Sequence, residues 1–278
     1  MRLIEKIKRR FKYLLSGLCF SGRGRITAMI RVKNGEEFLA ASILSILDHV
    51  DDVVIINNNS NDATSIIGQR LAELSDKVNL VDYPYDIIPI GETYQQVAAE
   101  NPNSPHLTST FYNFCLTKCH GQFVMKWDDD MIALANFERL VKEFRESRCL
   151  QLDFGGENLS ADMSHFLKWK AGIEPRIFPL CFSKFLSGEY GFVGKPGEFG
   201  GEYINTFVSD TRKVTIHEQV YAHLKYCKKD PISNQSKRFS ESLARHLTNR
   251  EPSFPEVSSQ INYWLAKAKD LGLTPTNQ

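Results

Sequence analysis

The fold is decided by three short segments, ITAMIRV (26–32), DVVIIN (52–57) and QFVMKW (122–127). Each is a nearly continuous apolar run, which is typical of a strand that is buried on both faces of a sheet. Helix-like segments with apolar residues at helical spacing lie between them. Strands that alternate with helices form a mainly parallel sheet with helices on both faces. The sequence therefore predicts an α/β fold, arranged as an αβα sandwich.

The same alternation extends to about residue 154. Further strands are predicted at 78–83 and 149–154, and helices at 34–47, 62–74, 94–99, 107–119 and 135–145. The first of these helices is expected to begin at Asn34, with Glu37 as its capping-box partner.

Three regions of different character follow from the pattern. Residues 1–24 predict a basic amphipathic helix, and residues 25–230 the main domain. Within that domain, residues 155–230 are rich in glycine and aromatic residues, which predicts an irregular α+β portion that completes a site. Residues 231–278 predict a helical extension, with helices at about 235–247 and 255–271.

Composition excludes several classes of protein. The chain has 278 residues, 42% of them hydrophobic, and a formal net charge of +1. A general nucleic-acid-binding protein would carry a basic excess, so nucleic acid is not an expected partner. The six cysteines form no CxxC pair, which indicates reduced core thiols rather than a zinc site. No apolar run reaches the ~18 residues of a membrane span.

The N-terminal segment carries most of the charge asymmetry. Residues 1–25 hold eight basic residues and one acid, and apolar residues recur at helical spacing on the opposite side. Such a helix can lie in the interface of an anionic membrane, which we expect of residues 1–20. The alternative is a helix that packs on its own domain with a solvated basic face.

WDDDM (127–131) places three successive carboxylates at the end of a buried strand. Three neighbouring like charges are costly unless something neutralises them, and a divalent cation is the simplest candidate. Oxygen ligands favour Mg²⁺ or Mn²⁺. The alternative is a solvated turn or an acidic helix start, because helix N-termini also favour acids.

IINNNSNDAT (55–64) leaves the second strand with a run of asparagines. Asparagine amides both donate and accept, so they can read the edge of a nucleobase. The alternative is an Asx turn that caps the following helix.

These motifs, in this order, resemble the family 2 glycosyltransferases of the GT-A fold. The matching segments are IRVKNGEEFL (30–39), IINNNSNDAT (55–64) and YNFCLTKCHGQFVMKWDDD (112–130), and the resemblance covers about residues 26–150. Members of that family are inverting transferases that use nucleotide-diphosphate sugars. The chain departs from the family pattern at Arg31, where proline is usual, at Asn57 and Asn58, which replace two acids, and at Tyr112, where arginine is common.

The resemblance implies a set of site residues by position. It assigns nucleotide-sugar binding to Arg31, Asn34, Asn57, Asn58, Asn113, Asp128, Asp129 and Lys225. It assigns the metal to Asp128, Asp130 and His223, where VYAHLKYCK (220–228) resembles a segment of lipopolysaccharide-core transferases. A lone histidine is otherwise more often a structural residue.

The catalytic base is expected from the glycine-rich loop 197–203. Glu202 follows Gly200 and Gly201, which let the backbone approach a substrate closely, and Glu198 is the rival. Both glutamates could instead be solvated loop residues.

Together the residues and the resemblance predict an inverting, metal-dependent glycosyltransferase. It would transfer a sugar to a glycan or glycolipid acceptor in cell-surface polysaccharide or lipopolysaccharide synthesis. The expected location is the cytoplasm, peripherally on the inner face of a bacterial membrane. The alternatives are a degenerate glycosyltransferase-fold scaffold without activity and a nucleotidyltransferase, although RVKNGEE (31–37) is a poor phosphate loop.

Overall fold

The computed structural model describes residues 24–89, 92–167, 171–180, 184–186, 203–206, 208–228 and 254–275. The N-terminal helix, the helix at 235–247 and both candidate bases, Glu198 and Glu202, lie outside these residues. The strands are β1 (Ile26–Val32), β2 (Asp52–Asn57), β3 (Val78–Asp82), β4 (Phe123–Asp128), β5 (Met131–Ala133), β6 (Gln151–Asn158), β7 (Ala171–Pro179), β8 (Lys184–Leu186), β9 (Tyr203–Asn205) and β10 (Lys213–His223). The helices are α2 (Leu39–Ile46), α3 (Thr64–Leu74), α4 (Glu92–Glu100), α5 (Thr108–Lys118), α6 (Phe137–Glu146) and α8 (Phe254–Asp270), with short 3₁₀ helices η2 (Asp210–Arg212) and η3 (Lys225–Cys227).

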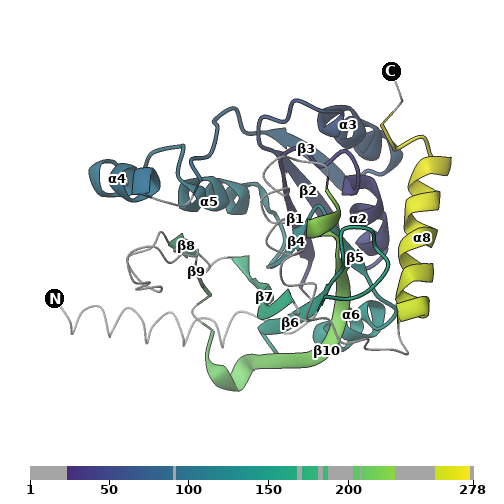
Figure 1. Cartoon of the computed structure of the whole chain (residues 1–278). Helices are drawn as coiled ribbons and strands as arrows, with labels where there is room; N and C mark the ends of the chain where they lie inside the picture. The colour runs from purple at the N-terminus through teal and green to yellow at the C-terminus, as the bar shows by residue number, and fades with distance from the viewer. Residues whose placement is uncertain are drawn as a thin grey trace.

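One large sheet organises the domain, with the strand order β3-β2-β1-β4-β7-β6-β10-β5 (Figure 1). Strands β3, β2, β1 and β4 are parallel neighbours, and β6 is parallel to β10. Strand β7 runs antiparallel between β4 and β6, and β5 runs antiparallel to β10. The predicted α/β fold with a mainly parallel sheet is therefore confirmed.

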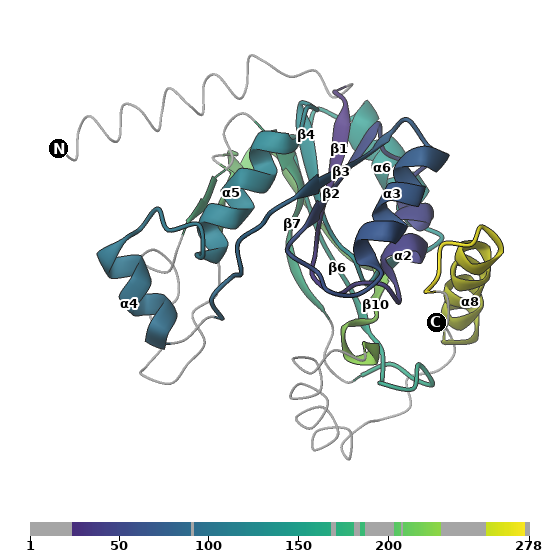
Figure 2. The same cartoon turned by 90° about the horizontal axis from the view of Figure 1, so that it is seen from above.

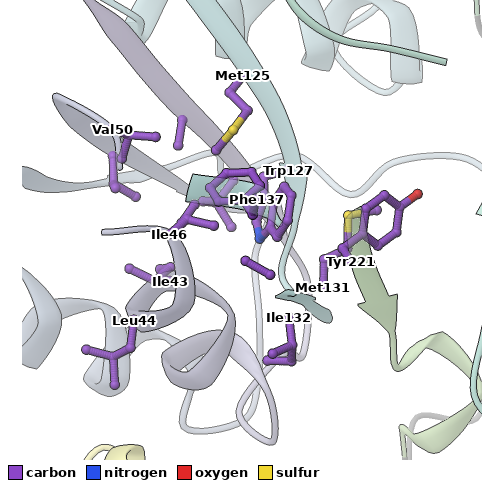
Figure 3. Packing of buried hydrophobic residues seen from close by; sticks show 14 of the residues in the cluster. Ile43, Leu44, Ile46, Val50, Met125, Trp127, Met131, Ile132, Phe137 and Tyr221 are labelled. Atoms are coloured by element: carbon purple, nitrogen blue, oxygen red, sulfur yellow. The ribbon is translucent and has the colours of Figure 1, made fainter. Parts of the chain in front are cut away.

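Helices cover both faces of the sheet (Figure 2). On one face, Met29 and Val54 pack with Phe111 and Cys115 of α5. On the other face lie α2, α3 and α6, with a core that includes Trp127 (Figure 3). Burial on both faces explains why these strands read as continuous apolar runs.

The predicted start of the first helix is wrong. Helix α2 begins at Leu39, after a turn in which the carbonyl oxygen of Gly35 accepts hydrogen bonds from the amides of Phe38 and Leu39. Asn34 adopts a left-handed conformation, with φ of 54°. Its side-chain oxygen accepts from the amide of Asn61, so it joins two loops instead of capping a helix.

The predicted irregular character of residues 155–230 is only partly correct. Strands β7 and β10 from this region belong to the main sheet and pair with β4 and β6. The sequence hid β10 because most of its first half is exposed, and only Val220–Ala222 are fully buried.

The C-terminal helix α8 packs against α2 on the outer side of the domain (Figures 1 and 2). Its buried residues Val257, Ile261 and Ala268 join the main core. The predicted helix at 255–271 is thereby confirmed. None of the described helices combines the length and apolar character needed to cross a membrane.

Candidate active site

The candidate site lies where the order of the sheet reverses. The chain builds β1, β2 and β3 outward in one direction and then returns to place β4 on the other side of β1. In open α/β sheets ligands bind outside the carboxyl ends of the strands at such a point. Here a cavity of about 410 Å³ is lined by residues that include Arg31, Lys33, Asn58, Tyr112, Asp128, Asp129, Asp130, His223, Lys225 and Lys228.

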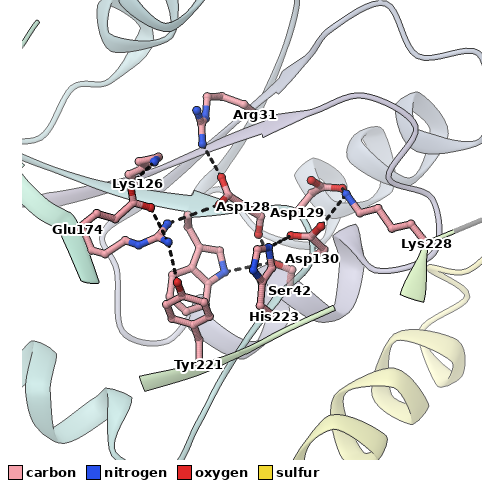
Figure 4. A network of polar contacts seen from close by, with 12 residues as sticks. Arg31, Ser42, Lys126, Asp128, Asp129, Asp130, Glu174, Tyr221, His223 and Lys228 are labelled. Carbon is pink, nitrogen blue, oxygen red and sulfur yellow. Dashed lines mark hydrogen bonds and ion pairs between the residues drawn. The ribbon is translucent and has the colours of Figure 1, made fainter. Parts of the chain in front are cut away.

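The first carboxylate of the cluster, Asp128, is held by two arginines, of which Arg31 is labelled in Figure 4. Arg31 from β1 donates a hydrogen bond to it, and Arg176 Nη1 from β7 lies 3.5 Å from its Oδ2. Burial by itself would raise the pKa of Asp128, but the charges of Arg31, Arg176 and Lys126 outweigh burial and hold the pKa far below its ordinary value. Asp128 is therefore the counter-ion of two buried guanidinium groups.

The other two carboxylates share one lysine. Lys228 Nζ lies 2.8 Å from Asp129 Oδ2 and 2.9 Å from Asp130 Oδ2. Burial raises the pKa of Asp129 to about 6, although Lys228 opposes this shift. For Asp130 burial acts in the same direction, but the charges of Lys228 and His223 prevail and lower its pKa.

His223 is engaged at both ring nitrogens. Its Nε2 lies 3.2 Å from Asp130 Oδ1, and its Nδ1 lies 3.0 Å from Asn158 Oδ1. The sequence-based pairing of His223 with the acidic cluster is therefore reproduced in space, as a contact with Asp130.

The expected metal ligands do not fit a divalent cation in this arrangement. Asp128 faces two arginines, and Asp130 faces His223 and Lys228, so basic groups occupy the places beside their oxygens. Across the described residues, no group of three or more histidine, cysteine, aspartate or glutamate side chains could hold a metal ion. In this arrangement basic side chains from distant segments neutralise the acids, and the expected ligand set of Asp128, Asp130 and His223 stays a prediction.

The backbone beneath the carboxylates is rigidly supported. Ser42 of α2 donates to the carbonyl oxygen of Asp128 at 2.9 Å and accepts from Trp127 Nε1 at 3.0 Å. Gly35 lets the loop after β1 pass close to Asp129, since a Cβ at this position would lie 2.4 Å from Asp129 Oδ2. Both contacts fix where the carboxylates lie.

The asparagine run contributes one residue to the cavity wall. Asn58 lines the cavity, and its amide donates to the carbonyl oxygen of Tyr85 at 2.7 Å. Asn57 is buried and donates to Asp82, while its own oxygen accepts from the amide of Ser60. Asn57 thus supports the turn, as the Asx-turn alternative expects, and its predicted contact with a nucleotide stays a prediction.

Of the remaining predicted residues, some line the cavity and others do not. Lys225, in η3, lines the cavity. Asn113, on α5, is half-buried and lies outside the set of lining residues, as does Asn34. Tyr112 lines the cavity and stacks against Arg31, whose guanidinium carbon lies 4.0 Å from the ring centroid.

The sequence analysis missed two basic residues, Lys228 and Arg176. Arg176 also contacts Glu174, which in turn pairs with Lys126 at 2.8 Å. Arg176 stands in a segment that reads as irregular, GIEPRIF (172–178), and Lys228 is one of several lysines after His223. The cost of three adjacent carboxylates was the one available signal, because it required counter-charges from somewhere in the chain.

A second cavity lies between α2, α6 and α8. It has a volume of about 450 Å³, and its lining includes Phe137, Tyr263 and Trp264. Its ionisable lining groups are His49, Glu138 and Tyr263. It has no counterpart of the charged cluster, so we place the candidate active site at the ends of β1 and β4.

No protein-family model and no curated protein matches this chain. Among solved structures it is similar to residues 1–349 of TarS from S. aureus, with 13% identity, a TM-score of 0.41, and coverage of 88% of this chain and 72% of that one. It is also similar to a mannosyltransferase from Pyrobaculum calidifontis in complex with GDP-mannose and Mn²⁺, with 14% identity, a TM-score of 0.41, and coverage of 95% and 81%. A third similar structure is glucosyl-3-phosphoglycerate synthase from Mycobacterium tuberculosis with Mn²⁺, UDP and glucosyl-3-phosphoglycerate, at 13% identity, a TM-score of 0.43, and coverage of 91% and 82%. Similarities at this level carry no argument about the substrate, so the chemistry has to come from the site itself.

Proposed function

We propose that this chain is a glycosyltransferase that binds a nucleotide-diphosphate sugar in the cavity at the ends of β1 and β4. The observation that carries the proposal is the composition of that cavity. The cavity is lined by the basic residues Lys33, Lys225 and Lys228. Tyr112 and Asn58 line the same cavity. This combination offers cations for a diphosphate, an aromatic face for a base, and a polar group that can read the base edge.

The size and place of the cavity support the same proposal. About 410 Å³ falls in the range of small-molecule and cofactor sites. The position at the switch point of the sheet is where nucleotides bind in doubly wound folds. Lys225 lies two residues beyond the end of β10, where it can approach a phosphate.

The transfer we propose is a direct displacement with inversion. The acceptor hydroxyl oxygen bonds to the anomeric carbon while the bond from that carbon to the diphosphate breaks. The hydroxyl proton passes to a carboxylate base, and the electron pair leaves with the nucleoside diphosphate. Glu202 is the proposed base and Glu198 its rival, on the strength of the glycine-rich loop in the sequence.

Glu202→Gln tests this base and is expected to lower the transfer rate by ~10²–10⁴ while nucleotide affinity stays near the wild-type value. Normal transfer by Glu202→Gln together with loss in Glu198→Gln would move the role to Glu198.

The proposed acceptor is a glycan or glycolipid of the cell surface, built at the cytoplasmic face of a bacterial membrane. The support is the family resemblance and the basic, amphipathic sequence of residues 1–20. Each basic residue near an anionic surface contributes ~1 kcal/mol, so deletion of residues 1–20 should abolish co-sedimentation with anionic vesicles. Unchanged sedimentation would contradict the membrane assignment and leave the transferase proposal standing.

Nucleotide binding decides the central proposal. We would titrate UDP, GDP, ADP and CDP by calorimetry into the wild type, Lys225→Ala and the control Lys213→Ala, whose lysine pairs with Asp210 away from the cavity. Loss of one charge-assisted contact, worth ~1.5–3 kcal/mol, should weaken binding ~10–100-fold in Lys225→Ala and leave the control unchanged. If none of these nucleotides binds the wild type, the chain is a scaffold and the proposal is wrong.

A further inference from the structure

The ammonium group of Lys228 occupies the place where the acidic cluster predicts a cation. Lys228 follows η3, and its Nζ reaches back to Asp129 at 2.8 Å and Asp130 at 2.9 Å, on the loop after β4 (Figure 4). These two carboxylates are adjacent in sequence and both side chains are buried, at 8% and 6% exposure. One ammonium therefore bridges two acids that a divalent cation would otherwise have to neutralise.

The carboxylates of the cluster are already matched by basic side chains. In the part of the chain that the structure describes, four lysine and arginine side chains face four carboxylates, and the set comprises Arg31, Lys126, Arg176, Lys228, Asp128, Asp129, Asp130 and Glu174. His223 also contacts Asp130. A divalent cation would add two positive charges to this set. It would also have to displace Lys228 and turn Asp128 away from its two arginines.

Lys228 also faces the proposed donor site. Lys228, Lys225 and Arg31 all line the same cavity as the three aspartates. A fixed ammonium at this place can contact phosphate oxygens, because lysine is a common phosphate ligand that acts as a point charge. Its anchoring by two buried acids keeps it in position before the nucleotide arrives, which lowers the cost of ordering the side chain.

We propose that Lys228, anchored by Asp129 and Asp130, supplies the positive charge that binds the donor diphosphate, so that nucleotide binding needs no divalent cation. This inference rests on the proposed function, and it departs from the metal dependence that the family resemblance implies. The leaving nucleoside diphosphate would be neutralised by a protein side chain.

Calorimetry with and without metal tests the inference. We would titrate UDP and GDP in EDTA and in Mn²⁺ into the wild type, Lys228→Met, Lys228→Arg and the control Lys213→Met. We expect the wild type and the control to bind equally well in both buffers. Lys228→Met should bind at least ~30-fold more weakly in EDTA, and Lys228→Arg, which keeps the charge, should retain most of the affinity.

The outcomes separate this inference from the proposed function. Binding by the wild type in Mn²⁺ but not in EDTA overturns the inference and leaves the transferase proposal intact. Equal affinity of Lys228→Met and wild type in EDTA also overturns it. Absence of binding in both buffers overturns the proposed function, and the inference with it. If Lys228→Met does not fold, the wild type and Lys228→Arg still decide the question.

Discussion

Asp128 and Asp129 are adjacent aspartates in one cluster, yet the structure predicts opposite responses to the same substitution. Asp128 is the counter-ion of Arg31 and Arg176, whose side chains are 7% and 3% exposed. Asp129 instead lies next to another carboxylate, Asp130, and shares Lys228 with it. Asp128→Asn should therefore destabilise the fold, whereas Asp129→Asn should not.

The magnitudes follow from burial and pairing. Removing one partner of a buried ion pair typically costs ~3–5 kcal/mol because the other charge remains buried. That is the loss we expect for Asp128→Asn at pH 7. The pKa of Asp129 is raised from 3.8 to about 6, so ionising Asp129 itself costs stability. Because Lys228 keeps Asp130 as a partner, Asp129→Asn should leave the free energy of unfolding unchanged or raise it.

Ionisation of Asp128 and ionisation of Asp129 have opposite effects on the free energy of unfolding. The pKa of Asp128 is held below its ordinary value, so its ionised form stabilises the fold above pH ~4, and this stabilisation is lost as the pH falls further. Burial raises the pKa of Asp129, so its cost is absent below pH ~4 and grows up to about pH 6. The difference between the variants should be largest at neutral pH and should narrow towards pH 4.

Urea unfolding without nucleotide measures both effects. Circular dichroism and tryptophan fluorescence, to which buried Trp127 contributes, should report one midpoint for each protein. With slopes of ~1–3 kcal/mol per M, a loss of ~3 kcal/mol lowers the midpoint by ~1 M or more. The double variant Asp128→Asn/Arg176→Met should lose less than the sum of the single variants, because it removes one of the stranded charges. Equal midpoints for Asp128→Asn and Asp129→Asn would refute the reasoning.

Three further predictions concern the support of the site. Gly35→Ala should cost ~1–3 kcal/mol in thermal unfolding, since its Cβ would clash with Asp129, whereas the control Gly172→Ala, with open space around it, should cost less than ~1 kcal/mol. Ser42→Ala removes a buried hydroxyl that both donates and accepts, so it should cost ~1–3 kcal/mol and weaken UDP or GDP binding in calorimetry. Ile261→Ala on α8, 2% exposed, should cost ~2–5 kcal/mol in urea unfolding without changing nucleotide affinity, because α8 does not line the cavity.

The strands that carry the site could be predicted from sequence because each is buried on both faces. The predicted strands 26–32 and 52–57 coincide with β1 and β2. A continuous apolar run needs no knowledge of its partners to be recognised. β10 could not be found in this way, because its burial comes from three residues at one end and its first half is largely exposed. The predicted start of α2 is wrong because Asn34 and Glu37 fit the capping-box pattern, whereas the Asn34 side chain accepts a hydrogen bond from the backbone amide of Asn61 in another loop.

The sequence predicts the residues of the candidate site that follow strand ends, but not the ion-pair partners that come from distant segments. The cluster at 128–130 and Arg31 are predicted because strand ends in such sheets converge on ligands. Lys225 is predicted only through the family resemblance. The ion-pair partners Arg176 and Lys228 could not be predicted in this way; Lys228, for example, lies 99 residues from Asp129 in sequence. Three buried like charges require opposite charges nearby. Either a metal ion or basic side chains can lower the energy of such a cluster, so the sequence alone does not distinguish them.

The order of the strands in the sheet determines that basic side chains, and not a metal ion, lie beside the carboxylates in this structure. β4 lies between β1, which brings Arg31, and β7, which brings Arg176, so Asp128 at its end receives a cation from each neighbouring strand. Strand β10 reaches the same region from the other half of the sheet, and the residues just after it place Lys228 against Asp129. Each segment that converges on the acids thus brings its own positive charge. A site neutralised in this way before any ligand binds must accept an anionic donor as an additional charge, and Lys225 and Lys228, which line the same cavity, are the side chains placed to contact it.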